Sequence, residues 1–338
     1  MIILAIETSC DETSAAVLKE NRCQLELLAN IISSQIDVHK KYGGVVPEVA
    51  ARMHIKNILP VIIEALVTAK IQPENIDLIA VTSGPGLLTS LIIGLETAKT
   101  LSFAWQKPLI AVNHIYSHIA ANFLKGQIKF PAICLVVSGG HTEIIYLKNY
   151  WQSKKIGQTV DDAAGEAFDK VAKLLGLSYP GGPVVSKMAL QGDAEKYKFP
   201  RPMMTANNFN FSFSGLKTAV LYQAQKEDLN KDQVIFDFCA SFEQAVVDVL
   251  VNKTLKAAKK FKVKTVILAG GVAANRKLRE TLEKKSQEAG FEFWVPELKL
   301  CTDNAAMVAI AGYYLSQKRK IKLDNYKKII VDPNWELK

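Results

Sequence analysis

The chain has 338 residues, of which 49% are hydrophobic and 22% charged, and it carries a formal net charge of +9. This length predicts about two domains with a sizeable core, and no apolar run approaches the roughly 20 residues that a membrane-spanning helix needs. The basic balance favours an acidic partner such as nucleic acid. The excess lies at 252–264 and 317–328, where a solvated helix face and a loose tail explain it equally well.

Runs of apolar, β-branched residues alternate with helical patterns along the whole chain, which is typical of an α/β fold. The predicted strands are 2–6, 15–20, 76–83, 108–113, 132–138, 143–148, 265–270 and 291–297. The predicted helices are 51–70, 86–105, 232–261 and 275–290. Pro60 is expected to kink or interrupt the first helix. The Pro-, Gly- and Asn-rich segment 179–214 is expected to be an irregular insertion.

Residues 2–18 and 132–147 share one plan: an apolar strand, a short turn of small polar residues, a threonine and a second strand. One such unit in each half suggests a duplicated, two-lobed fold with a ligand between the lobes.

The N-terminus and the cysteines indicate the compartment. MIILAIETSCDETS lacks the basic segment of a signal peptide, and five cysteines without a CxxC motif argue against a disulfide framework and a zinc ribbon. We therefore expect a cytoplasmic protein with reduced thiols.

Two histidines, His114 and His118, follow the apolar strand 108–113. Asn113 is a suitable N-cap, so both imidazoles are expected on one helix face at the carboxyl end of a strand. The spacing matches a zincin helix, but Ile115 stands where that helix needs its catalytic Glu. Asp303, before the last helix, is the best candidate for a third metal ligand. A pair of capping or surface histidines is the alternative.

Two glycine turns are candidate anion sites. Ser138, Gly139 and Gly140 follow a strand, and their backbone N–H groups could face an anion, although a plain hairpin turn fits equally well. Gly270 and Gly271 precede a helix that begins near Asn275, whose amide could bind a ribose or a base edge. Neither turn is a Rossmann or P-loop motif.

Several acidic residues are expected at turns: Asp11 and Glu12 in the first hairpin, and Asp161 and Asp162 in the second half. Asp169 is the best functional candidate of its segment, because a Gly181-Gly182 turn follows it. Glu166 and Lys170 are expected to be surface charges of a helix.

Taken in order, the motifs identify the chain as a member of the bacterial-type tRNA adenosine threonylcarbamoyltransferases, formerly described as O-sialoglycoprotein endopeptidases. The matching motifs are ETSCDET (7–13), YGGVVPE (42–48), SGPGL (83–87), NHIYSH (113–118), VSGGHTE (137–143), DDAAGEAFDK (161–170), YPGGP (179–183), FSFSGLKTA (211–219), AGGVAAN (269–275) and CTDNAAM (301–307).

The resemblance implies the duplicated fold of the actin, sugar kinase and Hsp70 group, with the active site in the cleft between the lobes. The lobes are expected at 1–128 with 303–338, and at 129–302. The family transfers threonylcarbamoyl from threonylcarbamoyl-AMP to N6 of the adenosine 3′ of the anticodon (position 37), in tRNAs that read codons starting with A. AMP is released.

The resemblance also implies site residues. His114, His118 and Asp303 are expected to bind one divalent metal ion, iron or zinc. The substrate-binding positions are expected at Val136, Val137, Ser138, Gly139, Gly140, Asp169, Gly182 and Asn275. The donor is already activated, so no covalent nucleophile is needed, and Asp11 or Glu12 is our candidate for accepting the proton of the adenine amine.

The resemblance to the bacterial-type branch of the family also implies partners: a paralogous partner subunit, a small ATPase and a separate synthase that makes the adenylate. Two other functions are considered, a metalloprotease and a non-catalytic scaffold. A metalloprotease would lack its catalytic base, because position 115 is not Glu. A non-catalytic scaffold would be expected to have lost the motif residues that this chain retains.

Overall fold

The computed structural model describes residues 1–22, 24–318 and 321–337. Cys23 and residues 319–320 of the predicted basic tail lie outside them. The chain divides into two compact units, Met1–Gln127 with Thr302–Lys338, and Ile128–Cys301. None of the described helices is both long and apolar enough to cross a membrane.

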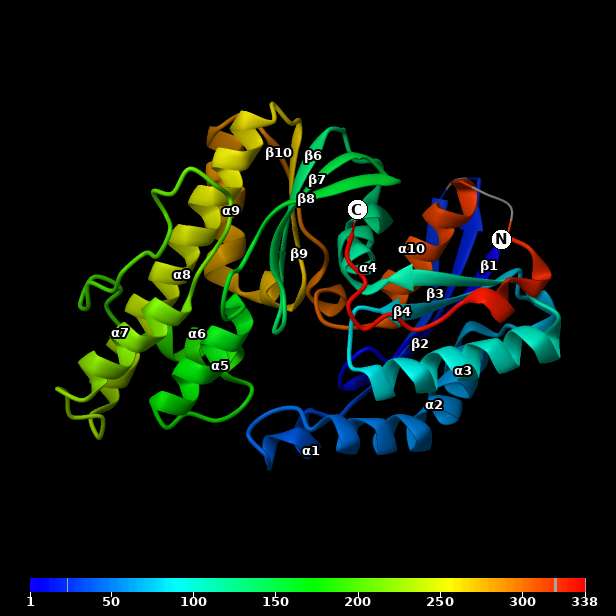
Figure 1. The fold of residues 1–338 in the computed structure, drawn as a ribbon, viewed down its shortest axis with the longest axis horizontal. Helices are drawn as coiled ribbons and strands as arrows, with labels where there is room; N and C mark the ends of the chain where they lie inside the picture. The colour runs from blue at the N-terminus through cyan, green and yellow to red at the C-terminus, as the bar shows by residue number, and fades with distance from the viewer. Residues whose placement is uncertain (23, 319–320, 338) are drawn as a thin grey trace. The chain divides into compact units, whose positions relative to one another are not determined.

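The first unit is built on a five-stranded mixed sheet with the order β3-β2-β1-β4-β5 (Figure 1). Its strands are β1 (Ile2–Glu7), β2 (Glu12–Asn21), β3 (Gln24–Ser34), β4 (Leu78–Gly84) and β5 (Leu109–Asn113). β1 pairs antiparallel with β2 and parallel with β4, and β4 is parallel to β5. The parallel strands therefore end at the same edge, and they are apolar because both faces of the sheet are covered.

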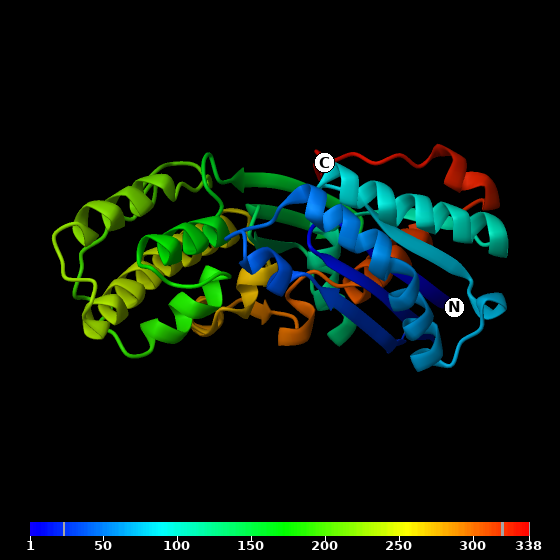
Figure 2. The same ribbon diagram turned by 90° about the horizontal axis from the view of Figure 1, so that it is seen from below.

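Helices cover both faces of this sheet. α2 (Pro47–Ala69) and α3 (Leu88–Trp105) lie side by side on one face (Figure 2) and enclose a core with residues such as Leu4 and Ile6. α10 (Ala305–Lys318) packs on the other face and is buried from Ala305 to Tyr313. The remaining helices of this unit are α1 (Ile36–Lys40), α4 (His114–Ala120) and the 3-10 helices η1 (Pro73–Asn75), η2 (Ala121–Lys125) and η5 (Leu323–Lys328).

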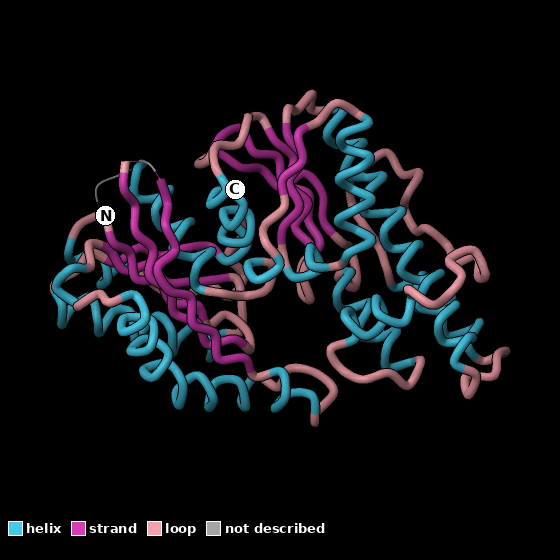
Figure 3. The backbone as a smooth tube through the Cα atoms, turned by 180° about the vertical axis from the view of Figure 1, so that it is seen from behind, coloured by secondary structure: helices cyan, strands magenta, loops and turns pink. Residues whose placement is uncertain are grey.

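The second unit is built on its own sheet (Figure 3). It repeats the same topology, with the strand order β10-β9-β6-β7-β8. Its strands are β6 (Ala132–Val137), β7 (Thr142–Asn149), β8 (Gln152–Gln158), β9 (Thr265–Ala269) and β10 (Glu292–Trp294). β6 pairs antiparallel with β7 and parallel with β9, as β1 does with β2 and β4. The duplication expected from the two hairpins is confirmed.

The core of the second unit forms between its sheet and the long helix α8 (Asp232–Lys260), where Phe238 and Phe242 are fully buried. Its other helices are α5 (Ala164–Leu174), α6 (Gly181–Ala189), α7 (Ser214–Ala224), α9 (Arg276–Glu288) and the 3-10 helices η3 (Gly271–Ala274) and η4 (Leu298–Leu300).

The structure corrects the sequence analysis at several places. α2 runs without interruption through Pro60, which is exposed. Strands β3 and β8 were missed, because as third strands of their meanders they carry polar residues at many positions. The expected irregular insertion at 179–214 contains α6, because its Gly- and Pro-rich start is the first turn of a helix whose Gly181 N–H donates to the Asp169 carboxylate at 2.7 Å.

Candidate metal and anion sites

The two histidines lie where the sequence predicts. β5 ends at Asn113, whose side-chain oxygen accepts the Tyr116 N–H at 3.0 Å and so begins α4. His114 occupies the first turn of α4 and His118 the next, and both are buried. Their ring centroids are 4.7 Å apart. The expected N-cap and the shared helix face are confirmed.

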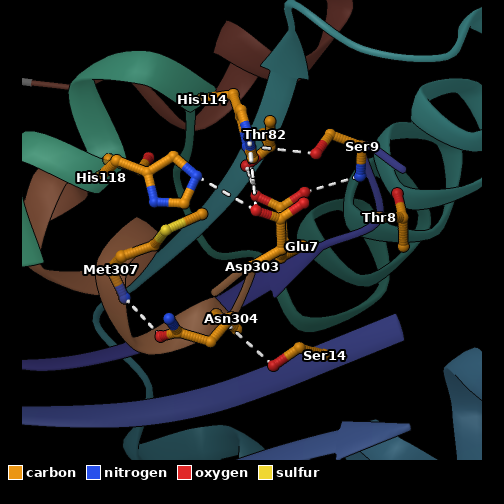
Figure 4. Close-up of polar contacts among 12 residues, drawn as sticks. Glu7, Thr8, Ser9, Ser14, Thr82, His114, His118, Asp303, Asn304 and Met307 are labelled. Carbon is orange, nitrogen blue, oxygen red and sulfur yellow. Dashed lines mark hydrogen bonds and ion pairs between the residues drawn. The ribbon is translucent and has the colours of Figure 1, made fainter. Parts of the chain in front are cut away.

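Asp303 lies beside these two rings (Figure 4). Its Oδ1 is 3.1 Å from Nε2 of His118 and 3.6 Å from Nε2 of His114. The start of α10 holds it there, because Ala305 N–H donates to the Ser14 hydroxyl of β2 at 2.8 Å. One ligand atom from each of the three residues lies within 4.8 Å of the others. The structure therefore brings together all three predicted ligands.

Glu7, a buried carboxylate at the end of β1, contacts the Nδ1 side of the His114 ring (Figure 4). It accepts hydrogen bonds from the Ser9 N–H at 2.6 Å and the Thr82 hydroxyl at 2.6 Å, and its Oε2 lies 3.3 Å from Nδ1 of His114. The sequence analysis missed Glu7. Its signal was an acidic residue that ends an otherwise apolar, buried strand.

The charges of this site depend on one another. Burial disfavours the ionised form of Glu7, but His114 lowers its pKa below the usual value. Burial lowers the pKa of His114, but the carboxylates of Asp303 and Glu7 outweigh this and raise it to about 9. The neighbouring carboxylates therefore favour the protonated form of this imidazole.

The donor atoms fit a divalent cation. Nδ1 of the buried His118 has no hydrogen-bond partner among the described residues, and Nε2 contacts only the Asp303 carboxylate there, at 3.1 Å; an unpaired buried polar group is costly. Nδ1 of His114 faces Glu7, so Nε2 is free to bind a metal, the arrangement in which a carboxylate orients a ligating histidine. Two imidazoles and one carboxylate suit a borderline divalent ion. Ile115, which stands where a zincin helix has its catalytic Glu, is buried in α4.

Asp11 and Glu12 lie where β1 turns into β2, and both are largely shielded from solvent. Glu12 accepts a hydrogen bond from the Ser34 hydroxyl at 3.2 Å. Burial, together with the negative charges of Asp303 and Asp11, raises the pKa of Glu12 to about 10. These effects favour the protonated form of Glu12, and a cation beside Asp303 would oppose them.

The turn after β6 is the predicted anion turn of the second unit. Ser138 N–H donates to the His141 carbonyl at 2.8 Å, and His141 N–H donates to the Ser138 hydroxyl at 3.1 Å. A side chain added at Gly139 or Gly140 would meet no atom within 4 Å. Gly165 at the start of α5 backs the turn, and a Cβ there would lie 2.6 Å from the Ser138 carbonyl oxygen. The sequence analysis missed this role of Gly165.

The turn after β9 packs against the end of β6. Gly270 has a φ of +90°, and a Cβ on it would lie 2.4 Å from the Val137 carbonyl oxygen. Asn275 caps α9 by accepting the Leu278 N–H at 2.8 Å. Its amide nitrogen donates to Ser186 of α6 at 2.8 Å and to Glu243 of α8 at 2.7 Å.

The other predicted positions of this unit join the same edge. Val136 and Val137 are the last residues of β6 and are fully buried. Asp169 of α5 accepts the first N–H of α6, and the next residue, Gly182, has open space beside it. The predicted set thus gathers at the carboxyl ends of β6 and β9 and the amino ends of α6 and α9. The side chains of Asp169 and Asn275 each hold a helix start.

The remaining acidic candidates have structural partners. Asp161 accepts the Phe213 N–H at 2.8 Å and the hydroxyl of Ser214, and so caps α7. Asp162 and Glu166 form ion pairs with Lys170 at 2.7 Å and 2.9 Å.

Solved structures with low sequence identity share this fold. HypF, crystallised in a phosphate- and nucleotide-bound form, superposes with a TM-score of 0.63 at 16% identity over 95% of this chain and 47% of HypF. The chain thus spans about half of HypF. Component A of the Acidaminococcus fermentans (R)-2-hydroxyglutaryl-CoA dehydratase gives a TM-score of 0.54 at 15% identity over 94% and 99% of the two chains. The chain therefore has the two-lobed fold of the actin, sugar kinase and Hsp70 group.

Sequence comparison identifies the family within this group. Residues 26–310 match the family model of tRNA N6-adenosine threonylcarbamoyltransferase, TsaD. The Thermosipho africanus protein of that name is 54% identical over 94% of this chain and 95% of its own length. The Syntrophomonas wolfei protein of that name is 52% identical over 93% and 92%. The chain belongs to the tRNA N6-adenosine threonylcarbamoyltransferase family and is a transferase.

Proposed function

We propose that the chain transfers the threonylcarbamoyl group of threonylcarbamoyl-AMP to N6 of the adenosine 3′ of the anticodon (position 37) and releases AMP. The substrates are tRNAs that read codons starting with A. The observation that carries this proposal is the metal-ligand group His114, His118 and Asp303 in a chain of this family. A mixed anhydride of a carbamate and a phosphate is already activated, so the protein needs only to position it, stabilise charge and take up a proton.

The first unit provides the groups for the threonylcarbamoyl end. His114, His118 and Asp303 would hold one Fe2+ or Zn2+ ion, which supplies a Lewis acid for the carbonyl. Glu7 keeps Nδ1 of His114 engaged, and Ser9 Oγ, 3.1 Å from the same nitrogen, adds a second contact. These contacts fix the ring that must present Nε2.

The second unit provides the groups for the AMP end. The backbone N–H groups of Gly139 and Gly140, beside open space, suit a phosphate on which charge increases as the anhydride breaks. The amino ends of α6 and α9 lie at the same edge and favour an anion there. Since the side chains of Asp169 and Asn275 hold these helix starts, we assign them to shaping this pocket as well as to substrate contact.

A carboxylate must take the proton that the adenine amine loses. Asp11 and Glu12 are adjacent, and two neighbouring carboxylates resist ionising together. We assign Asp11 or Glu12 as the acceptor of this proton.

An exposed apolar face of helix α2 is suited to binding a protein partner. Ile55, Leu59, Ile63 and Val67 recur at every fourth position of α2 and are 67%, 55%, 60% and 70% exposed. Four large apolar side chains on successive turns form a stripe of the kind that protein interfaces cover. We assign this stripe to the paralogous partner subunit, with the small ATPase joining the complex, and we place the complex in the cytoplasm, where it meets tRNA.

The test is reconstitution. The chain, its partner proteins and the adenylate synthase are incubated with threonine, bicarbonate, ATP and unmodified tRNA, and the modified nucleoside is sought by mass spectrometry. A His114→Gln/His118→Gln variant is expected to lose both bound metal and transfer. His54→Gln is the matched control, because His54 is buried in the same unit but bonds Thr13 and the Cys10 carbonyl instead. Full transfer by the double variant would refute the proposal.

A further inference from the structure

The second unit carries a cluster of lysines that the proposed reaction does not use. The sequence has no acidic residue at 144–160 or at 249–279. β7 and β8 bring Lys148 and Lys154 from the first stretch, and the end of α8 brings Lys256 and Lys260 from the second. All four side chains are exposed.

We propose that this lysine face, made of Lys148, Lys154, Lys256 and Lys260, binds the sugar-phosphate backbone of the tRNA stem adjoining the modified adenosine. The inference rests on the proposed function, because it takes tRNA as the substrate.

Ring contacts place the two groups of lysines together. Tyr146 of β7 packs on Phe261 at the end of α8, with ring centroids 5.2 Å apart. Lys154 is the cross-strand neighbour of Tyr146, so both side chains leave the same face of the sheet. Phe261 also packs on Phe209 at 6.1 Å, and Nζ of Lys260 lies 5.3 Å from the Phe209 ring centre. An aromatic ring therefore lies beneath the ammonium group of Lys260.

The positive charge of this face is not neutralised locally. Among the described residues, none of its four lysines has a carboxylate oxygen within 4.0 Å. In contrast, Lys155 of the same strand pairs with Glu143 at 3.6 Å. Burial lowers the pKa of the neighbouring Lys253, and the positive charge of Lys256 adds to this shift. Such a face attracts a polyanion.

The location suits a stem that leads away from the anion turn. Tyr146 pairs with Ile133 near the start of β6, whereas Ser138 follows the end of that strand. Five residues of strand span about 16 Å. The face therefore lies several nucleotides from the turn. Backbone contacts carry no sequence information, as a set of tRNAs with different stems requires.

The experiment compares two triple variants of the full chain in complex with its partner proteins. Lys148→Gln/Lys154→Gln/Lys260→Gln removes three charges from the face and leaves Lys256, whose amine holds the Ala206 carbonyl at 3.0 Å. The matched control replaces three exposed lysines of the same unit that lie on α5 and in the loops flanking α7, namely Lys173, Lys196 and Lys226. The probe is an unmodified transcript of a threonine tRNA, bound across a series of KCl concentrations without adenylate or metal.

The face variant is expected to bind tRNA roughly 10–100-fold more weakly near physiological salt, with its log–log salt slope reduced by about 2–3. Its kcat at saturating tRNA should be unchanged, and the corresponding Lys→Arg triple variant should bind like the wild type. Equal Kd and slope for the face and control variants would overturn the inference. If lysine-dependent binding is present but the wild type transfers no threonylcarbamoyl group, the proposed reaction fails and this surface stands.

Discussion

Glu7→Gln tests whether the buried carboxylate behind His114 prepares the metal site. The substitution keeps the size of the side chain but removes its charge. The Ser9 N–H, which donates to Oε1, can keep an acceptor of lower strength, whereas the Thr82 hydroxyl, which donates to Oε2, loses its acceptor if the amide NH2 takes that place. The Gln amide can also present its NH2 group to Nδ1 of His114, which favours the tautomer with its proton on Nε2. That proton would occupy the nitrogen that faces Asp303 at 3.6 Å.

The expected loss follows from the role of a carboxylate that supports a metal ligand. Replacing such partners lowers metal affinity roughly 10–100-fold, which corresponds to about 1.4–2.7 kcal/mol. His118 and Asp303 are untouched, so binding should weaken but not disappear. The site should remain selective for ions that accept nitrogen ligands.

The assay is competition for Zn2+ between the purified protein and a chromophoric chelator, with near-UV circular dichroism to show that the variant is folded. Glu48→Gln is the matched control, because Glu48 belongs to the same unit and its side chain is 75% exposed. Wild-type zinc affinity in folded Glu7→Gln protein would refute the reasoning.

Three further predictions concern other parts of the molecule. Gly165→Ala places a methyl group 2.6 Å from the Ser138 carbonyl oxygen and should raise KM for the adenylate at least several-fold, whereas Gly44→Ala, in open space, should not. Ile63→Asp puts a charge in the apolar stripe of α2 and should abolish co-elution with the partner subunit without lowering Tm. Asp161→Asn weakens the cap of α7 and should cost about 1 kcal/mol in urea denaturation at neutral pH. Burial raises the pKa of Asp161, but the hydrogen bonds from residues 212–214 outweigh this effect, so the pKa lies below its usual value. The ionised carboxylate therefore stabilises the fold above about pH 4. This stabilisation is lost in acid, where wild type and variant should have the same stability.

Much of the fold could be read from local patterns. Strand β1 and helix α3 are recognisable because burial on both sides of a parallel sheet requires continuous apolar runs and amphipathic crossover helices. Asn113 predicts the start of α4 because a cap acts within three residues. The His114 and His118 spacing likewise needs only helical geometry. Local chemistry therefore determined the two histidines and the glycine turns.

Long-range packing decided the rest. In the sequence, Glu7 is one acidic residue at the start of a polar turn. Only the sheet, in which β1 and β5 flank β4, brings it to His114. The sequence suggests that the Asn275 amide binds a ligand. The structure shows that residues of α6 and α8 accept hydrogen bonds from its nitrogen. Only the packing of α10 on the first sheet brings Asp303 to the histidines, because no periodicity in a sequence records which distant segments a folded core will join.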